Sequence, residues 1–491
     1  MSVIIKKYLC VFILFASVSL YVYGQEKIDY KVETFGSLGS GDYTPFWITN
    51  NTYGIVPLKS NNAYLRGSLG WRHSFSKDIN LETKIDLVAA TDHSSSFWIH
   101  QLFADISFQE LHLTVGNREN YNSILDRNLS SGDFNYSTNA RPIPEVNINF
   151  PYFVAVPFTR EILKFKADFA VGKSMDSDYI RRTNKQGDDY ATDILWHHKS
   201  LFFLLEDPDK KFPLSLILGL DHAAQWGGWT TFRDAGNQPK TFKDFLRIVM
   251  GKSGDERSLD TDKLNVLGNH QGTINLKIGY EVDNFKASVY KQHYYDDNSG
   301  LEYANWRDGI WGSEVSFYKQ NYLKKIVLEY IQTTNQSGPF HFLDYEYNGI
   351  GDRPRGGGND DYYNHEIYFS GWSYYGRGLG NPLLTSPEYN TDGAIYFKNN
   401  RVKAIHLGIE GNIISELSYR TLFTGTQSWG RMSHPFLKRK DNFSALVECN
   451  YRPEKWDGWL VGLQLGLDNG SLYNDNFGVS VKLSKSGSVS F

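Results

Sequence analysis

Hydrophobic and polar residues alternate with a period of two along much of the chain. The clearest case is WLVGLQLGLD (Trp459–Asp468): Trp, Val and three Leu residues fill one set of alternate positions, and Leu, Gly, Gln, Gly and Asp fill the other. Because successive side chains of a strand point to opposite faces, this pattern predicts a β-strand with one apolar face. That face would meet a second sheet in a soluble sandwich, or lipid in a membrane barrel.

The same alternation recurs from near residue 28 to the C-terminus, and no Pro/Ser-rich or charged linker interrupts it. It is found in segments 63–72, 81–89, 101–109, 274–281, 405–410, 443–450 and 477–484. Charged residues lie in mid-strand on the polar face: Arg66, Glu82, Lys84, Asp86, Asp105, Lys277, Glu281, Glu410 and Glu448. A barrel lumen would hold these charges, and so would the solvated face of a sandwich.

Three further features favour a membrane barrel. The segments run for about 9–11 residues, the length that a tilted strand needs to cross a bilayer. Aromatic residues gather at the predicted strand ends, as they do at membrane interfaces: Trp71, Phe97, Trp98, Trp456 and Trp459. The chain ends in Phe491, which resembles the terminal aromatic signal for the bacterial barrel-assembly machinery. We therefore predict an all-β fold, a large antiparallel transmembrane β-barrel of about 16–18 strands in outer-membrane lipid.

Residues 1–24 have the pattern of a secretory signal peptide. Two lysines form a charged start, an apolar stretch follows, and Val22 and Gly24 suit the cleavage site. An N-terminal membrane anchor is the alternative. We expect residues 25–491 to form a single barrel domain in the outer membrane of a Gram-negative cell, with a helical or loop insertion around 223–271.

The charge balance gives no reason to expect nucleic-acid binding. The chain of 491 residues has 51 Lys and Arg against 55 Asp and Glu, a formal net charge of -4. Removal of the signal peptide takes away Lys6 and Lys7, which makes the charge about -6. Only Cys449 would remain in the mature chain, so no intramolecular disulfide could form. Stability must therefore come from strand pairing and burial.

Short and long connections alternate, as expected for a barrel with turns at one end and loops at the other. Extended pieces such as Glu145–Asn149 are predicted to lie inside or across the lumen. The long irregular segments cover roughly 38–62, 117–160, 223–271, 334–366 and 371–400.

TFKDFLRIVM (Thr241–Met250) is the best helical candidate. Phe242, Phe245, Leu246 and Val249 share one face at i, i+3, i+4 and i+7 spacing, and a glycine follows as a stop. Such an amphipathic helix would pack against the barrel end or plug it. A surface decoration on a loop is the alternative.

Four segments, in this order, resemble the Wzi family of capsule-assembly outer-membrane proteins in the form found in Bacteroides-like bacteria. They are TPFWITNNTYGIVP (Thr44–Pro57), HQLFADISFQELHLTVGNRE (His100–Glu119), QWGGW (Gln225–Trp229) and YYGRGLGNPLL (Tyr374–Leu384). The resemblance implies a barrel of about 18 strands, a helical plug on the periplasmic side and extracellular loops that close the top. It also implies a role in holding capsular polysaccharide at the cell surface.

The densest cluster of aromatic and polar residues is Tyr345–Asn381. Aromatic rings stack on the apolar faces of sugars, and Arg donates paired hydrogen bonds to hydroxyl or uronate groups. We therefore single out these candidate glycan-binding residues: Arg353, Arg355, Tyr362, Tyr363, Trp372, Tyr374 and Arg377. An ordinary extracellular loop is the alternative, and the glycines and proline of Tyr374–Leu384 are better explained by a structural bend.

No arrangement of residues indicates catalysis, a metal site or a cofactor. Asp296–Asp297 and Asp360–Asp361 are adjacent pairs, whereas glycoside hydrolysis needs two carboxylates at a set separation, so we interpret them as solvated loop charges. His197–His198 lacks a second ligand pair at metal spacing, and no serine lies in a nucleophile-elbow context.

These features together predict a non-enzymatic outer-membrane barrel. It would bind or anchor capsular polysaccharide or exopolysaccharide at the cell surface during capsule assembly. A carbohydrate-selective outer-membrane porin, in which the lumen charges set selectivity, is the alternative.

Overall fold

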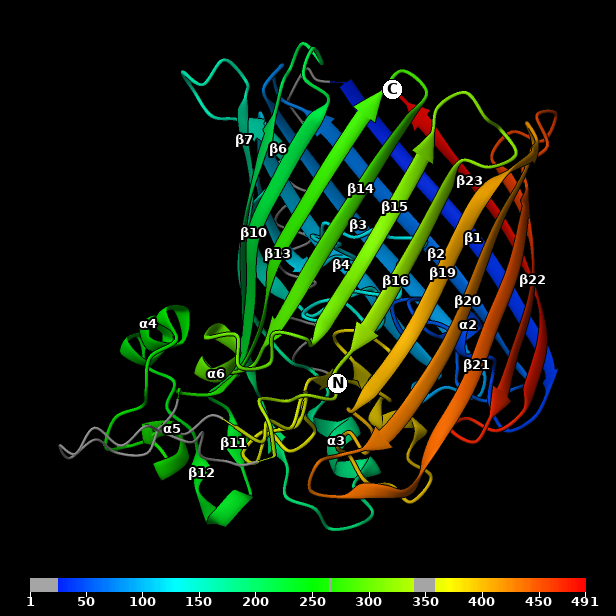
Figure 1. Cartoon of the computed structure of the whole chain (residues 1–491). Coiled ribbons are helices and arrows are strands. Elements are labelled where there is room, and N and C mark those ends of the chain that lie inside the picture. The colour runs from blue at the N-terminus through cyan, green and yellow to red at the C-terminus, as the bar shows by residue number, and fades with distance from the viewer. Residues whose placement is uncertain (1–24, 265, 340–357) are drawn as a thin grey trace.

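Eighteen antiparallel strands close into a barrel (Figure 1). The computed structural model describes residues 25–264, 266–339 and 358–491. Each wall strand pairs with the next one along the chain, and the last strand pairs with the first, so that Lys27 lies opposite Ser490. The wall strands are β1 (Gln25–Ser40), β2 (Asn62–Ser74), β3 (Ile79–Ala90), β4 (Phe97–Phe108), β5 (Leu111–Asn117), β6 (Glu145–Ala155), β7 (Leu163–Lys173), β9 (Leu195–Glu206), β10 (Leu214–Trp226), β13 (Asn269–Val282), β14 (Phe285–Tyr295), β15 (Gly309–Phe317), β16 (Lys325–Gln332), β19 (Val402–Ile414), β20 (Leu417–Gly430), β21 (Pro435–Tyr451), β22 (Trp459–Gly470) and β23 (Asn476–Ser490).

The alternating pattern identified the wall. All eight alternating segments belong to wall strands, and the strand number agrees with the family resemblance. The placement of Glu145–Asn149 in the lumen was wrong, because these residues begin β6 and pair with β5 and β7. Val146 and Ile148 are about half exposed on the outer face and Asn147 is buried, so the alternation also holds here.

The apolar face of each wall strand points out of the barrel. In β22, Leu463 is 45% exposed and Gln464 is 9% exposed. A continuous outer surface of Leu, Val, Ile and Phe is favourable in contact with hydrocarbon and costly in water. The outer surface therefore faces lipid, and the polar face lines the lumen.

The two ends of the barrel differ in the length of their connections. Short turns such as 283–284 and 415–416 join the strands at the end that holds Lys27 and Ser490. The opposite end, at the bottom of Figure 1, carries the long connections 41–61, 118–144, 174–194, 227–268 and 333–401. Outer-membrane barrels have short periplasmic turns and long extracellular loops, so the long end faces the cell exterior.

Short helices and short strand pairs occur in the long connections. The helices are α2 (Phe46–Thr49), α3 (Ser177–Thr183), α4 (Phe242–Met250), α5 (Asp260–Leu264), α6 (Asn298–Leu301) and the 3-10 turns η2 (Phe232–Asp234) and η3 (Pro387–Tyr389). The short strands are β8 (Ala191–Thr192), β11 (Trp229–Thr230), β12 (Gly236–Asn237), β17 (Ser373–Tyr374) and β18 (Arg377–Gly378). Within the described parts of the chain, no helix is both long and apolar enough to cross a membrane.

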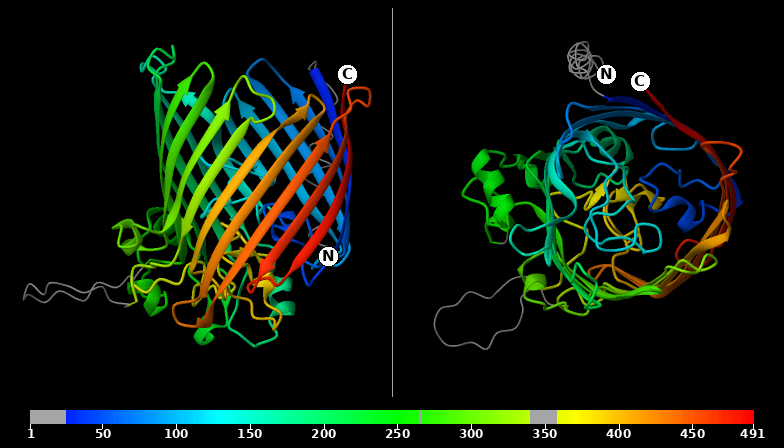
Figure 2. Two further views of the ribbon diagram at one scale, coloured as in Figure 1. Left: turned by 45° about the vertical axis from the view of Figure 1, so that its right-hand side comes forward. Right: turned by 90° about the horizontal axis from the view of Figure 1, so that it is seen from above.

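The predicted helix is confirmed as α4, but it lies outside the barrel wall (Figure 2). The helix that enters the lumen is α2, drawn in blue inside the ring of strands in the same figure. The family resemblance implies a plug on the periplasmic side. Here the inward-folding segments come from the extracellular end, because the turns at the other end are too short to reach into the lumen.

Candidate functional site

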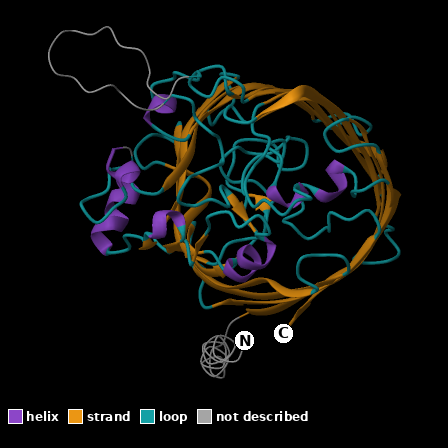
Figure 3. Ribbon diagram, turned by 90° about the horizontal axis from the view of Figure 1, so that it is seen from below, coloured by secondary structure: helices purple, strands orange, loops and turns teal. Residues whose placement is uncertain are grey.

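Three segments from the extracellular end fold into the barrel and pack together. We call residues 41–61 the first plug segment, 118–144 the second and 358–401 the third. Figure 3 shows loops and helices across the mouth of the barrel. Buried residues of all three segments form one apolar core with the wall, including Trp47, Phe134, Tyr363, Tyr290 and Leu446. This part of the lumen is therefore packed like a protein interior rather than filled with water.

Helix α2 of the first plug segment sits on small residues of the wall. A Cβ atom on Gly466 would lie 2.8 Å from Pro45 Cβ and 2.8 Å from Ile48 Cδ1. Phe46 N donates a hydrogen bond to Asp468 Oδ2 at 3.0 Å, which satisfies one of the free N–H groups at the start of the helix. Gly466 and Asp468 on the polar face of β22 thus form the contact surface for helix α2.

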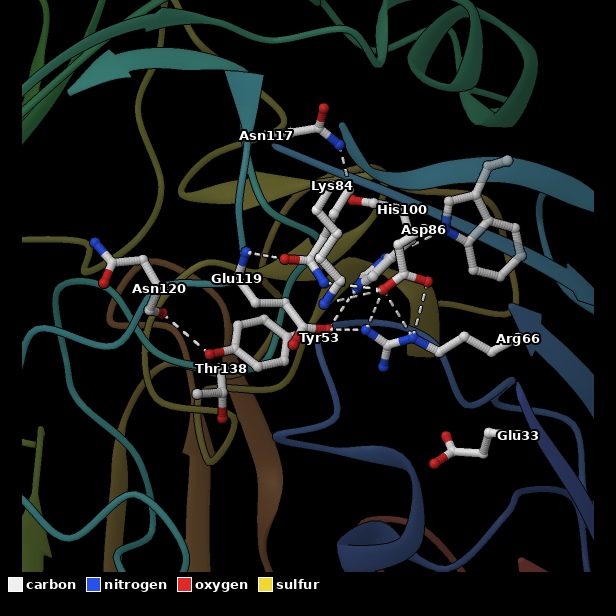
Figure 4. A network of polar contacts seen from close by, with 12 residues as sticks. Glu33, Tyr53, Arg66, Lys84, Asp86, His100, Asn117, Glu119, Asn120 and Thr138 are labelled. Carbon is white, nitrogen blue, oxygen red and sulfur yellow. Dashed lines mark hydrogen bonds and ion pairs between the residues drawn. The ribbon is translucent and has the colours of Figure 1, made fainter. Parts of the chain in front are cut away.

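A network of charges joins the second plug segment to the wall (Figure 4). Arg66 of β2 donates from Nη2 to Glu119 Oε1 at 2.7 Å and to Asp86 Oδ2 at 2.6 Å. His100 Nε2 lies 2.9 Å from Glu119 Oε1. Burial would raise the pKa of Glu119, but the hydrogen bond with His100 and the charge of Arg66 outweigh it and hold that pKa well below its usual range. Glu119 therefore stays ionised and anchors the plug.

A β-bulge brings two consecutive residues of β4 into this network. Asp86 pairs with Gln101, and the pairing then skips His100. Both His100 and Gln101 are buried in the lumen, where Gln101 donates to Asp86 Oδ2 and accepts from Glu119 N, each at 2.9 Å. Strict alternation would send one of the two side chains toward lipid, so the bulge is what makes the network possible.

A second anchor holds the middle of the second plug segment. Glu329 of β16 accepts hydrogen bonds from Ser130 Oγ at 2.7 Å and from Ser131 N at 2.8 Å. Tyr290 Oη donates to the same carboxylate at 2.8 Å. Nearby, His406 Nε2 lies 2.8 Å from Leu129 O. The segment is therefore fixed to wall strands at its start and at its middle.

The structure places the described members of the predicted glycan site inside the third plug segment. Tyr362, Tyr363 and Trp372 are fully buried, and Tyr374 and Arg377 are buried almost as completely. Arg353 and Arg355 lie outside the described residues. The prediction expected side chains that contact sugar at the surface, and the five described ones instead occupy the plug core.

These buried side chains join the plug segments to one another. Trp372 Nε1 donates to Asn135 O of the second segment at 2.7 Å, and Tyr363 Oη donates to the neighbouring carbonyl of Phe134. Arg377 Nη1 donates to Thr49 O of the first segment at 3.2 Å. Their aromatic and cationic character therefore serves the packing of the plug.

An open pocket of about 340 Å³ lies at the extracellular end, between α3 and the third plug segment. Helix α3 supplies Tyr179 and Arg182, and Lys185, two residues after the helix end, also lines the pocket. The polar residues that complete the lining are Asp176, Thr183, Ser370, Ser373, Glu388, Asn390 and Thr391. The pocket thus offers hydroxyl, amide, carboxylate and cationic groups on one surface.

Tyr179 of the pocket lining is paired with Tyr375, which lies next to it. The ring centroids of Tyr179 and Tyr375 are 5.8 Å apart, and both side chains are partly exposed. Gly376 has a φ of 78°, and a Cβ atom on it would lie 2.1 Å from Tyr179 Oη, so glycine is required here. Tyr375 N donates to Asp176 Oδ2 at 3.1 Å, which fixes the loop against α3.

The buried Arg377 orients one carboxylate of the pocket. It forms an ion pair with Glu388, which lines the pocket. Burial raises the pKa of the other lining carboxyl, Asp176, to about 6. Tyr179 and Arg182 were not predicted as site residues, although SDYIRRT contains the same combination of Tyr and Arg as Tyr345–Asn381.

A cluster of carboxylates lies elsewhere at the extracellular end. Oxygen atoms of Asp296, Asp297 and Asp360 lie within 4.8 Å of one another. The interpretation of the aspartate pairs as solvated charges was wrong for Asp360, which is buried. Burial and the charge of Asp297 raise the pKa of Asp360 to about 8. Such a group of oxygen donors is of the kind that holds a hard divalent cation.

The chain matches the family model of the capsule assembly protein Wzi over residues 47–388. Among solved structures, it is similar to Wzi of Escherichia coli, described as a carbohydrate-binding outer-membrane β-barrel involved in group 1 capsule assembly. The sequences are 12% identical, the TM-score is 0.57, and the match covers 93% of this chain and 83% of that one. OccK5 (OpdH) of Pseudomonas aeruginosa is 9% identical with a TM-score of 0.48, covering 94% and 98% of the two chains. No curated protein sequence matches the chain.

The similarity to the Escherichia coli structure shows the fold, and the family match extends to the site. Residues 47–388 include α3, the second plug segment and every residue that lines the pocket up to Glu388. The match also spans the wall strands that hold Arg66 and Glu329. This protein belongs to the Wzi family of capsule-assembly proteins.

Proposed function

We propose that this outer-membrane protein holds capsular polysaccharide at the cell surface by binding it in the pocket between α3 and the third plug segment. The observation that carries the proposal is the position of the pocket. Its lining combines Tyr179 with cations and carboxylates at the extracellular end of a plugged barrel, and Tyr375 lies beside Tyr179. A rigid plug holds the pocket in place while the barrel wall anchors it in the membrane.

The chemistry of the pocket suits a polar, acidic sugar chain. Tyr179, and the part of the Tyr375 ring that Arg141 leaves uncovered, would offer aromatic surface to the C–H faces of sugar rings. Arg182 and Lys185 lie at the surface and would pair with uronate or other acidic groups. Asn390 and the hydroxyl groups of the lining would bond to sugar hydroxyls.

The residues singled out from the sequence have supporting roles in this proposal. Arg377 orients Glu388, and Tyr374 pairs with Arg377 on either side of the turn that holds Gly376. Arg353 and Arg355 remain proposed glycan contacts. The barrel-assembly machinery, with Phe491 as its signal, remains the proposed partner for membrane insertion.

We propose binding rather than catalysis as the activity. The description of the Escherichia coli relative as a carbohydrate-binding barrel supports this choice. The porin alternative requires a water-filled path, whereas the extracellular part of this lumen holds a packed core. An anchor needs no such path.

Neighbouring arginines of α3 provide a matched test. Arg182 lines the pocket, whereas Arg181 pairs with Asp178 at 2.7 Å and is not part of the lining. We expect Tyr179→Ala combined with Arg182→Ala to release capsule from the cells into the medium, and Arg181→Ala to retain it. Cell-attached and shed polysaccharide are measured in a deletion strain that carries each variant. Full retention by the double variant, with normal barrel assembly, would remove this pocket from consideration.

A further inference from the structure

We infer that helix α4 binds anionic lipid of the outer leaflet and so seats the barrel in the membrane. This inference concerns the outer wall and does not depend on the proposed polysaccharide site. The view from above in Figure 2 shows α4 outside the ring of strands, and Figure 1 shows it beside the extracellular end of β10.

Local signals at both ends define α4. Thr241 and Asp244 form a capping box, in which Thr241 N donates to Asp244 Oδ2 at 2.8 Å and Asp244 N donates to Thr241 Oγ1 at 3.3 Å. Gly251 ends the helix in the left-handed conformation with a φ of 60°. The register of the helix is therefore fixed, and so is the direction of each side chain.

One edge of α4 docks on the outer face of the barrel. The ring centroid of Phe245 lies 5.7 Å from that of Trp226 and 6.4 Å from that of Phe169. Ile248, one turn further along, is fully buried against Trp226 and Leu267. The helix thus lies along the barrel wall and not in the extracellular solvent beyond the end of the barrel.

Beneath α4 the outer face of the wall is polar. His197 and Lys199 of β9 share the outward face with Leu201, and His222 of β10 and His270 of β13 lie beside them. Lys199 Nζ donates to Val249 O at the C-terminal end of α4. The helix therefore covers polar wall positions at the extracellular limit of the apolar belt, which is the level of the membrane interface.

The second edge of α4 is apolar and exposed. Phe242, Leu246 and Met250 lie on one side at i, i+4 and i+8, and they are 74%, 41% and 55% exposed. This edge continues the lipid-facing surface of the wall, where Phe169 and Leu201 are also exposed. Continuity with that surface identifies the occupant as the hydrocarbon of the outer leaflet.

Exposed cations flank this edge. Lys240 and Lys243 lie at the start of the helix, and Lys252 lies just after its end. Interfacial helices combine an apolar face with Lys and Arg that reach anionic headgroups. The bound lipid is therefore anionic. Its acyl chains would contact the apolar edge of α4, and its negatively charged headgroups would pair with the flanking lysines.

Spin labelling of the full chain tests this inference. Cys449 is the only cysteine among the residues that the structure describes, so Cys449→Ser provides the background. Labels are placed at Leu246→Cys and Phe242→Cys on the apolar edge, and at Glu256→Cys, an exposed position of the same connection, as the control. The barrels are reconstituted in phosphatidylcholine vesicles that contain lipopolysaccharide. Accessibility is measured to oxygen, which enters lipid, and to a nickel chelate, which stays in water.

We expect the ratio of oxygen to nickel accessibility to be several-fold higher at both apolar-edge labels than at Glu256→Cys. Equal ratios at all three sites would overturn the inference, because they would place the edge in water. Dipolar broadening between labels on two molecules would also overturn it, because a second copy of the chain would then cover the edge. Heat-modifiable migration on gels confirms beforehand that each labelled barrel has assembled.

Discussion

Arg66 of the barrel wall and Glu119 of the second plug segment form an ion pair of 2.7 Å across 53 positions of the sequence. The wall residue is tied to its strand neighbour Asp86, and the plug residue is tied to the bulged His100. The pair therefore connects the two structural parts of the molecule, the membrane-embedded wall and the segments that fill it. Its loss should loosen the plug without opening the wall.

Glu119→Gln should make the plug leak. The wild-type protein should show little steady current in a planar bilayer, whereas the variant should show transient openings. The loss of one charged partner of the partly buried Arg66 should cost about 1–3 kcal/mol. Glu256→Gln, on an exposed connection, serves as the control. A variant that shows no transient openings and has unchanged thermal stability would show that the ion pair does not hold the plug.

Gly466→Val should displace helix α2 from its seat. The added side chain would meet Pro45 and Ile48, and overpacking of this kind costs about 1–3 kcal/mol. Gly425→Val is the matched control, because a Cβ atom there meets nothing within 4 Å. The temperature at which the folded band is lost on gels should fall for the first variant only. Equal temperatures for both variants would contradict the close contact.

Leu463→Arg should impair barrel assembly, and Gln464→Arg should be tolerated. Leu463 lies in the middle of β22 on the lipid face, where an arginine costs about 2–4 kcal/mol. Gln464 faces the polar lumen opposite Glu448, which already pairs with Arg420 and Lys482, so the new cation would join an existing group of charges and not enter lipid. The assembled fraction in outer membranes measures both effects. Assembly of the two variants to the same level would contradict the assignment of the two faces.

The acidic cluster should make one extracellular loop sensitive to pH. Burial and the charge of Asp297 raise the pKa of Asp360 from 3.8 to about 8, so the folded loop holds this proton more tightly than an unfolded chain does. Its contribution to stability is therefore present at low pH and declines as the pH rises toward 8. Asp360→Asn should weaken this dependence, because burial and the charge of Asp360 also raise the pKa of the neighbouring Asp296. The new amide can still accept the hydrogen bond from Ser337 Oγ.

Hydrogen exchange of residues 296–308, measured at about pH 6 and about pH 9 after correction for intrinsic rates, tests this expectation. Wild-type protection should fall between the two conditions, and the variant should lose less protection over the same interval. The same fall in both proteins would assign the pH dependence to another group.

Deletion of Phe491 should slow assembly and leave the finished barrel stable. The side chain is 74% exposed, so its removal takes little away from the folded state. Its backbone N donates to Glu26 O at 3.0 Å at the seam between the two terminal strands. Pulse-chase measurement of the heat-modifiable band separates the rate of assembly from the final stability. An unchanged rate would remove Phe491 from the assembly signal.

The sequence by itself determined the wall and its orientation. A period of two is a property of neighbouring residues, so the lipid face of β22 and of seven other strands follows from their order along the chain. Helix α4 was also predictable, because its capping residues and its apolar face lie within one short segment. The four family motifs added the strand number and the capsule-assembly family.

Only the tertiary structure decided what the polar and aromatic residues do. Trp372 and Tyr363 have the residue types of a sugar site, but the segment that carries them is folded inward, where they bond the carbonyls of Asn135 and Phe134. Tyr179 and Arg182 come to the surface because α3 packs beside that segment. Even the bulge at His100 depends on a partner strand. These contacts join residues that are far apart along the chain. A pattern of neighbouring residues therefore cannot predict them.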